Sequence, residues 1–155
     1  MKDIETTSAA PLHTPLVNRL AAEFGATWVD ETSVNDWAAQ GGDRVVLLAG
    51  DAVRTPEGQD VAVVLPELQR HASKRFEIAV VPVDQEEQVA RRYGINRWPT
   101  LLFLRDGKFV TSIAGMLDWQ PFVQAVEAAL RMPTSRPPTI GIPVVSAWAS
   151  DASCG

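Results

Sequence analysis

The stretch that decides the fold covers residues 84–107 and reads DQEEQVARRYGINRWPTLLFLRDG. Its first part has the charge order of a short helix, because Glu86 and Glu87 follow Asp84 and the arginine pair Arg91-Arg92 comes one turn later. Acidic residues in a first turn and basic residues in a last turn stabilise a helix through its macrodipole. We therefore predict a helix capped by Asp84, with Glu86 and Glu87 as solvated residues of its first turn.

The second part of this stretch has the pattern of a strand followed by a hairpin. Trp98-Pro99-Thr100 leads into the apolar residues 101–104, and such a run suits a strand that is buried on both faces. Asp106-Gly107 is a dipeptide typical of two-residue hairpin turns. The turn predicts a returning strand at residues 108–114, antiparallel to the first.

Outward from this stretch, strands and helices alternate along the chain. The segments 44–49, which is apolar after Arg44, and 78–83 predict two buried strands, and a short strand is expected at 26–30. Helical spacing of apolar residues predicts four further helices, at 15–24, 33–40, 61–75 and 119–130. We expect Thr14 to cap the first of these and Gly25 to end it, and we expect Ser33 and Asp36 to form a variant capping box at the second. The segment 50–60 is expected to be an acidic loop. This order predicts an α/β fold with a mixed central sheet and helices on both faces.

Length and composition bound the organisation and the class of partner. A chain of 155 residues with 46% hydrophobic and 21% charged residues forms one ordinary globular domain. We expect a flexible leader at 1–13, the domain at 14–131 and an extended or disordered Pro-rich tail at 132–155. The net charge of −5 disfavours nucleic acid as a partner. No signal-peptide core or bilayer-spanning run is visible, so we expect a cytoplasmic protein without membrane insertion.

Cysteine usage removes several kinds of chemistry. Cys154 is the single cysteine of the chain, so an intrachain disulfide, a Cys-x-x-Cys pair and a cysteine zinc site are all excluded. The two histidines, His13 and His71, do not form a ligand pattern, and His71 lies among basic residues. We therefore expect no metal, no cofactor and no catalytic residues.

Residues 45–130 resemble thioredoxin in an ordered set of motifs. The matching pieces are Pro66 within a helix, Trp98-Pro99-Thr100 after Tyr93-Gly94, and Gly115. The resemblance implies a thioredoxin-like fold with an added N-terminal helix, and a cis peptide bond at Pro99. It also implies that the redox motif should occupy residues 58–61, which read Gly-Gln-Asp-Val and carry no sulfur. A thioredoxin-like chain without thiols here cannot perform thiol–disulfide exchange at this position.

A closer resemblance covers nearly all of the predicted domain. The segments Trp28-Val29, Asp36-Trp37 and Arg54-Thr55-Pro56-Glu57 look like the hydrogenase expression/formation proteins of the HupG/HyaE type. This resemblance implies a non-redox assembly chaperone for [NiFe]-hydrogenase maturation. Its implied partner is the twin-arginine signal peptide of the small-subunit precursor, with other hydrogenase accessory proteins as a further class of partner.

Two groups of residues are candidates for binding this partner. The first surrounds the lost redox motif and offers carboxylates to arginine side chains; it consists of Asp51, Glu57, Gln59 and Asp60. The second is the segment before the predicted strand, with an aromatic surface for peptide contact; it consists of Trp98, Pro99 and Thr100. A purely structural interpretation stays open, in which Asp60 caps a helix and Trp98 packs on its neighbours.

Two other functions remain open at the level of sequence. One is a thioredoxin-like oxidoreductase that uses Cys154 with an external thiol. The other is a generic thioredoxin-like scaffold whose groove binds a different extended peptide. The position of Cys154 on the expected tail argues against the oxidoreductase. The residues alone do not separate the generic scaffold from the chaperone, so the family resemblance carries that choice.

Overall fold

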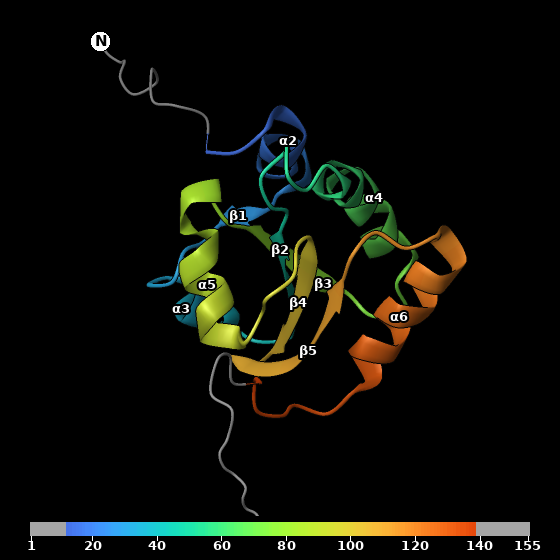
Figure 1. Ribbon diagram of the computed structural model, residues 1–155. Coiled ribbons are helices and arrows are strands. Elements are labelled where there is room, and N and C mark those ends of the chain that lie inside the picture. The colour runs from blue at the N-terminus through green and yellow to red at the C-terminus, as the bar shows by residue number, and fades with distance from the viewer. Residues whose placement is uncertain (1–11, 139–155) are drawn as a thin grey trace, which may run out of the picture.

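The computed structural model describes residues 12–138 and contains one five-stranded sheet (Figure 1). The strands lie in the order β1-β3-β2-β4-β5. Their bounds are Thr27–Trp28 for β1, Asp43–Leu48 for β2, Phe76–Val80 for β3, Thr100–Arg105 for β4 and Lys108–Ala114 for β5. β3 is parallel to β1 and β2, whereas β4 is antiparallel to β2 and β5. The expected mixed sheet is confirmed.

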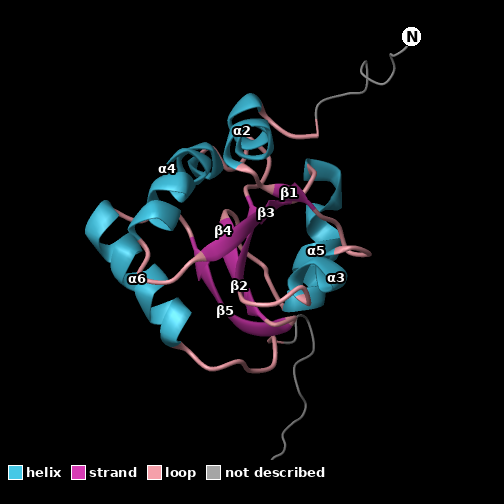
Figure 2. Ribbon diagram, turned by 180° about the vertical axis from the view of Figure 1, so that it is seen from behind, coloured by secondary structure: helices cyan, strands magenta, loops and turns pink. Residues whose placement is uncertain are grey.

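Helices cover both faces of this sheet, as Figures 1 and 2 show from opposite sides. One face carries α2 (Pro15–Phe24), α4 (Glu57–His71) and α6 (Trp119–Arg131). The other carries α3 (Val34–Ala38) and α5 (Glu86–Tyr93), with the short 3₁₀ helix η1 (Val83–Gln85) leading into α5. The α/β class and the thioredoxin-like arrangement predicted from sequence are therefore confirmed, including the added N-terminal helix α2.

The central strand β2 separates two hydrophobic cores. Val45 and Leu47 point into the core beneath α2, α4 and α6, while Val46 and Leu48 point into the core beneath α3 and α5. Successive side chains of a strand face opposite sides, so a strand covered on both faces must be apolar at every position. This is why residues 45–49 read as an uninterrupted apolar run.

Several local predictions are confirmed. The side chain of Thr14 accepts a hydrogen bond from the backbone of Val17 and caps α2, which ends at Gly25 in the left-handed conformation. The Asp106-Gly107 turn has positive φ at both residues, as a two-residue hairpin turn requires. The peptide bond between Trp98 and Pro99 is cis.

The start of α4 differs from the prediction. We expected a helix over 61–75, but it spans Glu57–His71 with Pro56 at the N-cap position. Proline has its φ angle fixed near the helical value, and the φ of Pro56 is −62°. Part of the expected acidic loop is thus the first turn of a helix, and Asp60 is not its cap. Pro66 lies buried inside this helix.

Two predicted caps are also wrong. Asp84 lies within η1, and the α-helix that follows begins at Glu86. Asp36 makes no capping box with Ser33, because the Ser33 hydroxyl instead donates to the carboxylate of Asp30. At Ser33 the turn built on Asp30 takes the hydroxyl that the cap pattern assigns to the helix, and at Asp84 the 3₁₀ turn moves the start of the α-helix to Glu86.

The expected leader and tail both touch the domain where the structure describes them. The carbonyl of Leu12 accepts a hydrogen bond from the backbone of Val83, and His13 is buried, so residues 12 and 13 pack as part of the domain. In the tail, Ser135 donates its backbone N–H to the Phe109 carbonyl of β5 at 2.7 Å. Residues 1–11 and 139–155, including Cys154, lie outside the described residues. Within residues 12–138, no helix has the length and apolar character needed to cross a membrane.

Candidate functional site

The position expected for the lost redox motif is closed by backbone packing. Residues 58–61 form the first turns of α4, and Gly58 is buried against the end of β2. A Cβ atom at Gly58 would overlap the carbonyl oxygen of Ala49. No side chain fits there without a shift of the backbone. The first position of the motif therefore excludes cysteine by geometry, beyond its absence from the sequence.

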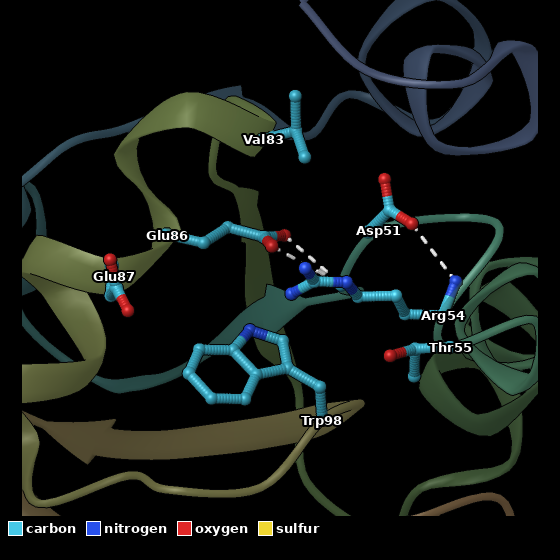
Figure 3. Close-up of a pocket in the computed structure, with 8 residues that line it drawn as sticks. Asp51, Arg54, Thr55, Val83, Glu86, Glu87 and Trp98 are labelled. Carbon is cyan, nitrogen blue, oxygen red and sulfur yellow. Dashed lines mark hydrogen bonds between the residues drawn. The ribbon is translucent and has the colours of Figure 1, made fainter.

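An open cavity of about 360 Å³ lies beside this closed position. We call it the Trp98 cavity (Figure 3). The loop after β2 forms one wall, the start of α5 forms the opposite wall, and the indole of Trp98 lies between them. The lining residues are Gly50, Asp51, Arg54, Thr55, Val83, Glu86, Glu87 and Trp98.

Glu86 is a buried carboxylate that ties three segments together. Only 4% of the residue is exposed. Its oxygens accept the backbone N–H of Gly50 at 3.1 and 3.2 Å and lie 3.0 Å from Nε2 of His13. Nδ1 of His13 accepts the N–H of Thr14 at 3.0 Å, so the ring proton must be on Nε2 and is donated to Glu86. The prediction that Glu86 is solvated is wrong, because its hydrogen bonds replace water; Glu87 is exposed, as predicted.

The helix that carries these glutamates is anchored on its inner side. The Tyr93 hydroxyl donates to the side-chain oxygen of Asn35 on α3 at 3.1 Å. Burial raises the pKa of the Tyr93 phenol, although nearby Arg92 acts in the opposite direction. The phenol therefore keeps its proton and remains a hydrogen-bond donor at neutral pH. Gly94, in the left-handed conformation, ends the helix.

The opposite wall of the cavity is a turn built on Asp51. Oδ2 of Asp51 accepts the backbone N–H groups of Val53 and Arg54, at 3.1 and 2.9 Å. The Asp51 carbonyl also accepts the N–H of Thr55 at 2.7 Å. From this turn the Arg54 side chain extends along the cavity, which it helps to line (Figure 3). Arg54 makes no ion pair with any residue that the structure describes.

Of the predicted Trp98-Pro99-Thr100 group, Trp98 alone offers its side chain to the cavity. Trp98 is half-buried and packs against the core beneath α5. The carbonyl of Pro99 accepts the N–H of Gly115 at 2.8 Å. Thr100 is 2% exposed, and its hydroxyl donates to the Arg97 carbonyl at 2.7 Å. Pro99 and Thr100 are therefore buried next to Trp98 in the chain and do not line the cavity.

Trp98 also borders two smaller hollows of about 250 Å³ each. One lies along α5 and is lined by Glu87, Ala90, Arg91, Ile95, Asn96 and Trp98. The other is lined by Arg97, Trp98, Ala114 and Gly115. The surface around this indole is thus concave on three sides, which gives a ligand more contact area than a flat face.

The remaining predicted residues lie outside the cavity. Glu57 and Asp60 are exposed on the first turns of α4. The side-chain oxygen of Gln59 accepts the hydroxyl of Thr14 at 2.7 Å, which joins α4 to the start of α2. Among the acidic residues predicted after β2, Asp51 alone lines the cavity.

Sequence reasoning missed two features of the site. Arg54, singled out as part of a family segment, was given no role, and Glu86 and Glu87 were assigned to solvent. The segment Arg54-Thr55-Pro56-Glu57 was a usable signal, because a charged residue in a loop beside the expected site is a candidate contact. In residues 12–138, no group of three or more His, Cys, Asp or Glu side chains is arranged to hold a metal ion.

The fold and the closed redox position define a thioredoxin-like protein without the thiol pair. A mutant thioredoxin from Halobacterium salinarum aligns over 81% of this chain and 97% of its own, with a TM-score of 0.55 and 19% identity. That likeness concerns the fold. The family model of the hydrogenase-1 expression protein HyaE matches residues 16–122, more than half of the chain. The chain therefore belongs to this family.

Two relatives support the assignment over almost the full length. The hydrogenase expression/formation protein HoxO of Cupriavidus necator is 53% identical over 153 residues, covering 97% of this chain and 92% of the relative. The protein of the same name from Azotobacter vinelandii is 31% identical over 140 residues, covering 90% and 93%. The resemblance to HupG/HyaE-type proteins that the sequence motifs suggested is thus confirmed.

Proposed function

We propose that this protein is a non-redox accessory protein of [NiFe]-hydrogenase maturation that binds the twin-arginine signal peptide of the small-subunit precursor at the Trp98 cavity. Family membership and the names of the relatives support a role in hydrogenase expression or formation. The encounter takes place in the cytoplasm, before export of the precursor. The protein acts by reversible binding and not as an enzyme.

The observation that carries this proposal is the pairing of a closed redox position with an open, carboxylate-bearing cavity beside it. Gly58 leaves no room for a thiol at the position where a thioredoxin reacts. On the same surface, Asp51, Glu86 and Glu87 face a cavity with an indole between them. The protein therefore has a cavity large enough for a ligand beside a position where a cysteine thiol has no room.

The chemistry of this cavity suits a guanidinium group. Asp51 uses Oδ2 for its turn, which leaves Oδ1 as an acceptor, and Glu87 is exposed on the opposite wall. Carboxylates bind guanidinium groups through charge-assisted and often bidentate hydrogen bonds. The face of Trp98 adds a stacking surface for a cation. The negative charge of Glu86 contributes to the attraction, although its hydrogen bonds are already satisfied within the protein.

Calorimetry with two peptides tests the proposal. One is the signal peptide of the small-subunit precursor, and the other has both arginines replaced by glutamine. The Asp51→Asn/Glu87→Gln double variant should lose about 1–3 kcal/mol of binding free energy with the first peptide, the range for hydrogen bonds to charged groups. Asp60→Asn is the matched control, since Asp60 is an exposed acid outside the cavity, and it should bind like the parent protein.

Salt dependence and the apolar contact give two further measurements. The charge contribution should weaken as ionic strength rises, because exposed charges are screened beyond about 8–10 Å at physiological salt. The loss caused by Trp98→Ala should persist at high salt, since packing on an aromatic face is not screened. Equal binding of the two peptides would remove the guanidinium mechanism. If neither peptide bound, the assignment of the signal peptide as partner would fall.

A further inference from the structure

Three exposed apolar side chains lie around the Trp98 cavity. Val83 lines the cavity itself. Leu12 lies beside Val83, because the carbonyl of Leu12 accepts the Val83 N–H at 3.0 Å. Val53 belongs to the turn on the opposite wall, where its N–H donates to Oδ2 of Asp51 at 3.1 Å. We call Leu12, Val53 and Val83 the apolar rim of the cavity.

The members of the apolar rim are poorly covered by the rest of the protein. Leu12, Val53 and Val83 are 45%, 89% and 42% exposed. Turns normally carry polar residues or glycine, and a valine that is 89% exposed contributes almost nothing to the protein's own core. Exposed apolar side chains that gather around a cavity are typical of a binding surface. The other large apolar side chains exposed in residues 12–138 do not line the cavity; they are Leu16, Val63, Trp119 and Met132.

The backbone holds the apolar rim in position before any ligand arrives. The Asp51 carboxylate fixes Val53, and the hydrogen bond to Leu12 fixes Val83. Val83 also begins η1, in which the N–H of Gln85 donates to the Pro82 carbonyl at 2.9 Å. Valine is stiff at χ1, so little side-chain freedom is lost when it is covered. The apolar rim is therefore a preformed contact surface.

We propose that the apolar rim binds the apolar core of the signal peptide while the Trp98 cavity binds its arginines. This inference rests on the proposed function and deepens it. A signal peptide places a basic region before an apolar run of about 7–15 residues. The protein offers the same two chemical features side by side, with the carboxylates of Asp51 and Glu87 in the cavity and apolar side chains at its edge.

Recognition of both features distinguishes a signal peptide from other basic peptides. A peptide that carries arginines without an apolar run uses the carboxylates and leaves the apolar rim in water. A peptide with both features also buries the apolar rim, and this second contribution is not screened by salt. The loss of one buried methyl-sized group lowers affinity about fourfold. The apolar rim therefore adds selectivity that the carboxylates alone do not give.

Calorimetry on two proteins and two peptides tests the inference. The proteins are the parent chain and Val53→Thr/Val83→Thr, in which threonine keeps the shape of valine and replaces one methyl group by a hydroxyl. The peptides are the signal peptide and a form with serine in place of the aliphatic residues of its apolar core and both arginines kept. The double variant should bind the signal peptide about tenfold more weakly than the parent chain does. The two proteins should bind the serine peptide within about twofold of each other, because a double-mutant cycle isolates the contact between the altered groups.

Val63→Thr is the matched control. Val63 lies on α4 and is 46% exposed, close to the value for Val83, but it does not line the cavity. This variant should bind the signal peptide within about twofold of the parent chain. Urea unfolding checks that the variants are folded. If the double variant is destabilised, Val53→Thr alone is used, since this side chain is almost uncovered, and it should bind the signal peptide about fourfold more weakly.

The outcomes separate the apolar rim from the choice of partner. If the double variant binds the signal peptide like the parent chain, or loses the same factor for both peptides, the apolar rim is not the contact and the proposed function stands. If no protein binds either peptide, both proposals fall. If the rim variants lose affinity selectively, but a peptide with glutamine in place of both arginines binds as well as the signal peptide, the apolar rim stands and the guanidinium mechanism falls. A rim variant that instead changes the oligomeric state in sedimentation velocity would assign the apolar rim to a contact between copies of this chain and overturn the proposal.

Discussion

The two walls of the Trp98 cavity use carboxylates in opposite ways. On the α5 wall, Glu86 is buried, and both of its carboxylate oxygens accept hydrogen bonds from His13 or Gly50. On the loop wall, Asp51 is exposed and uses one oxygen to fix its own turn. Glu86 thus joins α5 to two distant segments, because Gly50 lies 36 residues and His13 lies 73 residues before it in the sequence. The Asp51 side chain instead accepts hydrogen bonds from residues of its own turn. A carboxylate at the rim of a cavity is therefore a structural element or a binding group according to its burial and partners.

The strongest test of this contrast is the pair Glu86→Ala and Glu87→Ala. Loss of the Glu86 carboxylate leaves the buried donors of His13 and Gly50 without partners, which should reduce the free energy of unfolding by about 2–4 kcal/mol. Glu87 occupies the next position of the same helix turn but is exposed, so its loss should change stability by less than about 0.5 kcal/mol. Urea unfolding monitored by circular dichroism measures both. Similar losses in the two variants would show that Glu86 acts only through the helix terminus.

A second test addresses the closed redox position. Alanine normally stabilises a helix interior by about 0.5–1 kcal/mol relative to glycine. At Gly58 the added methyl group would meet the Ala49 carbonyl, so Gly58→Ala should instead destabilise the protein by about 1–3 kcal/mol, as overpacking does. The sign of the change, measured by urea unfolding, is the informative result. A stabilised Gly58→Ala variant would mean that the start of α4 can move away from β2 and that the position is open to a side chain.

The parts of the fold that sequence could predict are those decided by neighbours in the chain. The Thr14 cap, the Asp106-Gly107 turn and the apolar run of β2 each follow from residues within one element. The cis bond at Pro99 required the family resemblance, because X-Pro bonds are cis in only about 5–6% of cases. The family could also be predicted from the sequence, because its motifs are short and contiguous.

The parts that escaped prediction depend on contacts between distant segments. Glu86 looks like an ordinary first-turn acid until the chain brings His13 and Gly50 to it. Glu57 and Gln59 were placed beside the redox position because residues near the motif in sequence were assumed to share its surface. The early start of α4 instead distributes them around a helix, with Gln59 turned toward α2. Helical periodicity was the rule that this assignment overlooked.

Gln59 gives a smaller test of the same contrast. It was predicted to contact the partner, but its side chain forms a hydrogen bond within the protein. Its side chain accepts the hydroxyl of Thr14, the residue that caps α2. Gln59→Ala should cost about 1 kcal/mol of stability, the typical net value of one hydrogen bond, and should leave affinity for the signal peptide unchanged. Thermal unfolding and calorimetry on the same sample separate the two effects. A loss of peptide affinity without a loss of stability would indicate that Gln59 contacts the peptide.

The smallest expected effect concerns Glu57, which sequence reasoning treated as the equal of Asp51. Glu57 is exposed at the start of α4 and does not line the cavity, so Glu57→Gln should change affinity for the signal peptide by less than about twofold, as expected for a screened surface charge. Asp51→Asn is the comparison, because asparagine also supports this kind of turn and so removes the charge alone. Its affinity should fall about tenfold or more, the scale of one hydrogen bond to a charged group. Equal losses at both positions would indicate that the whole acidic segment, and not the cavity, attracts the peptide.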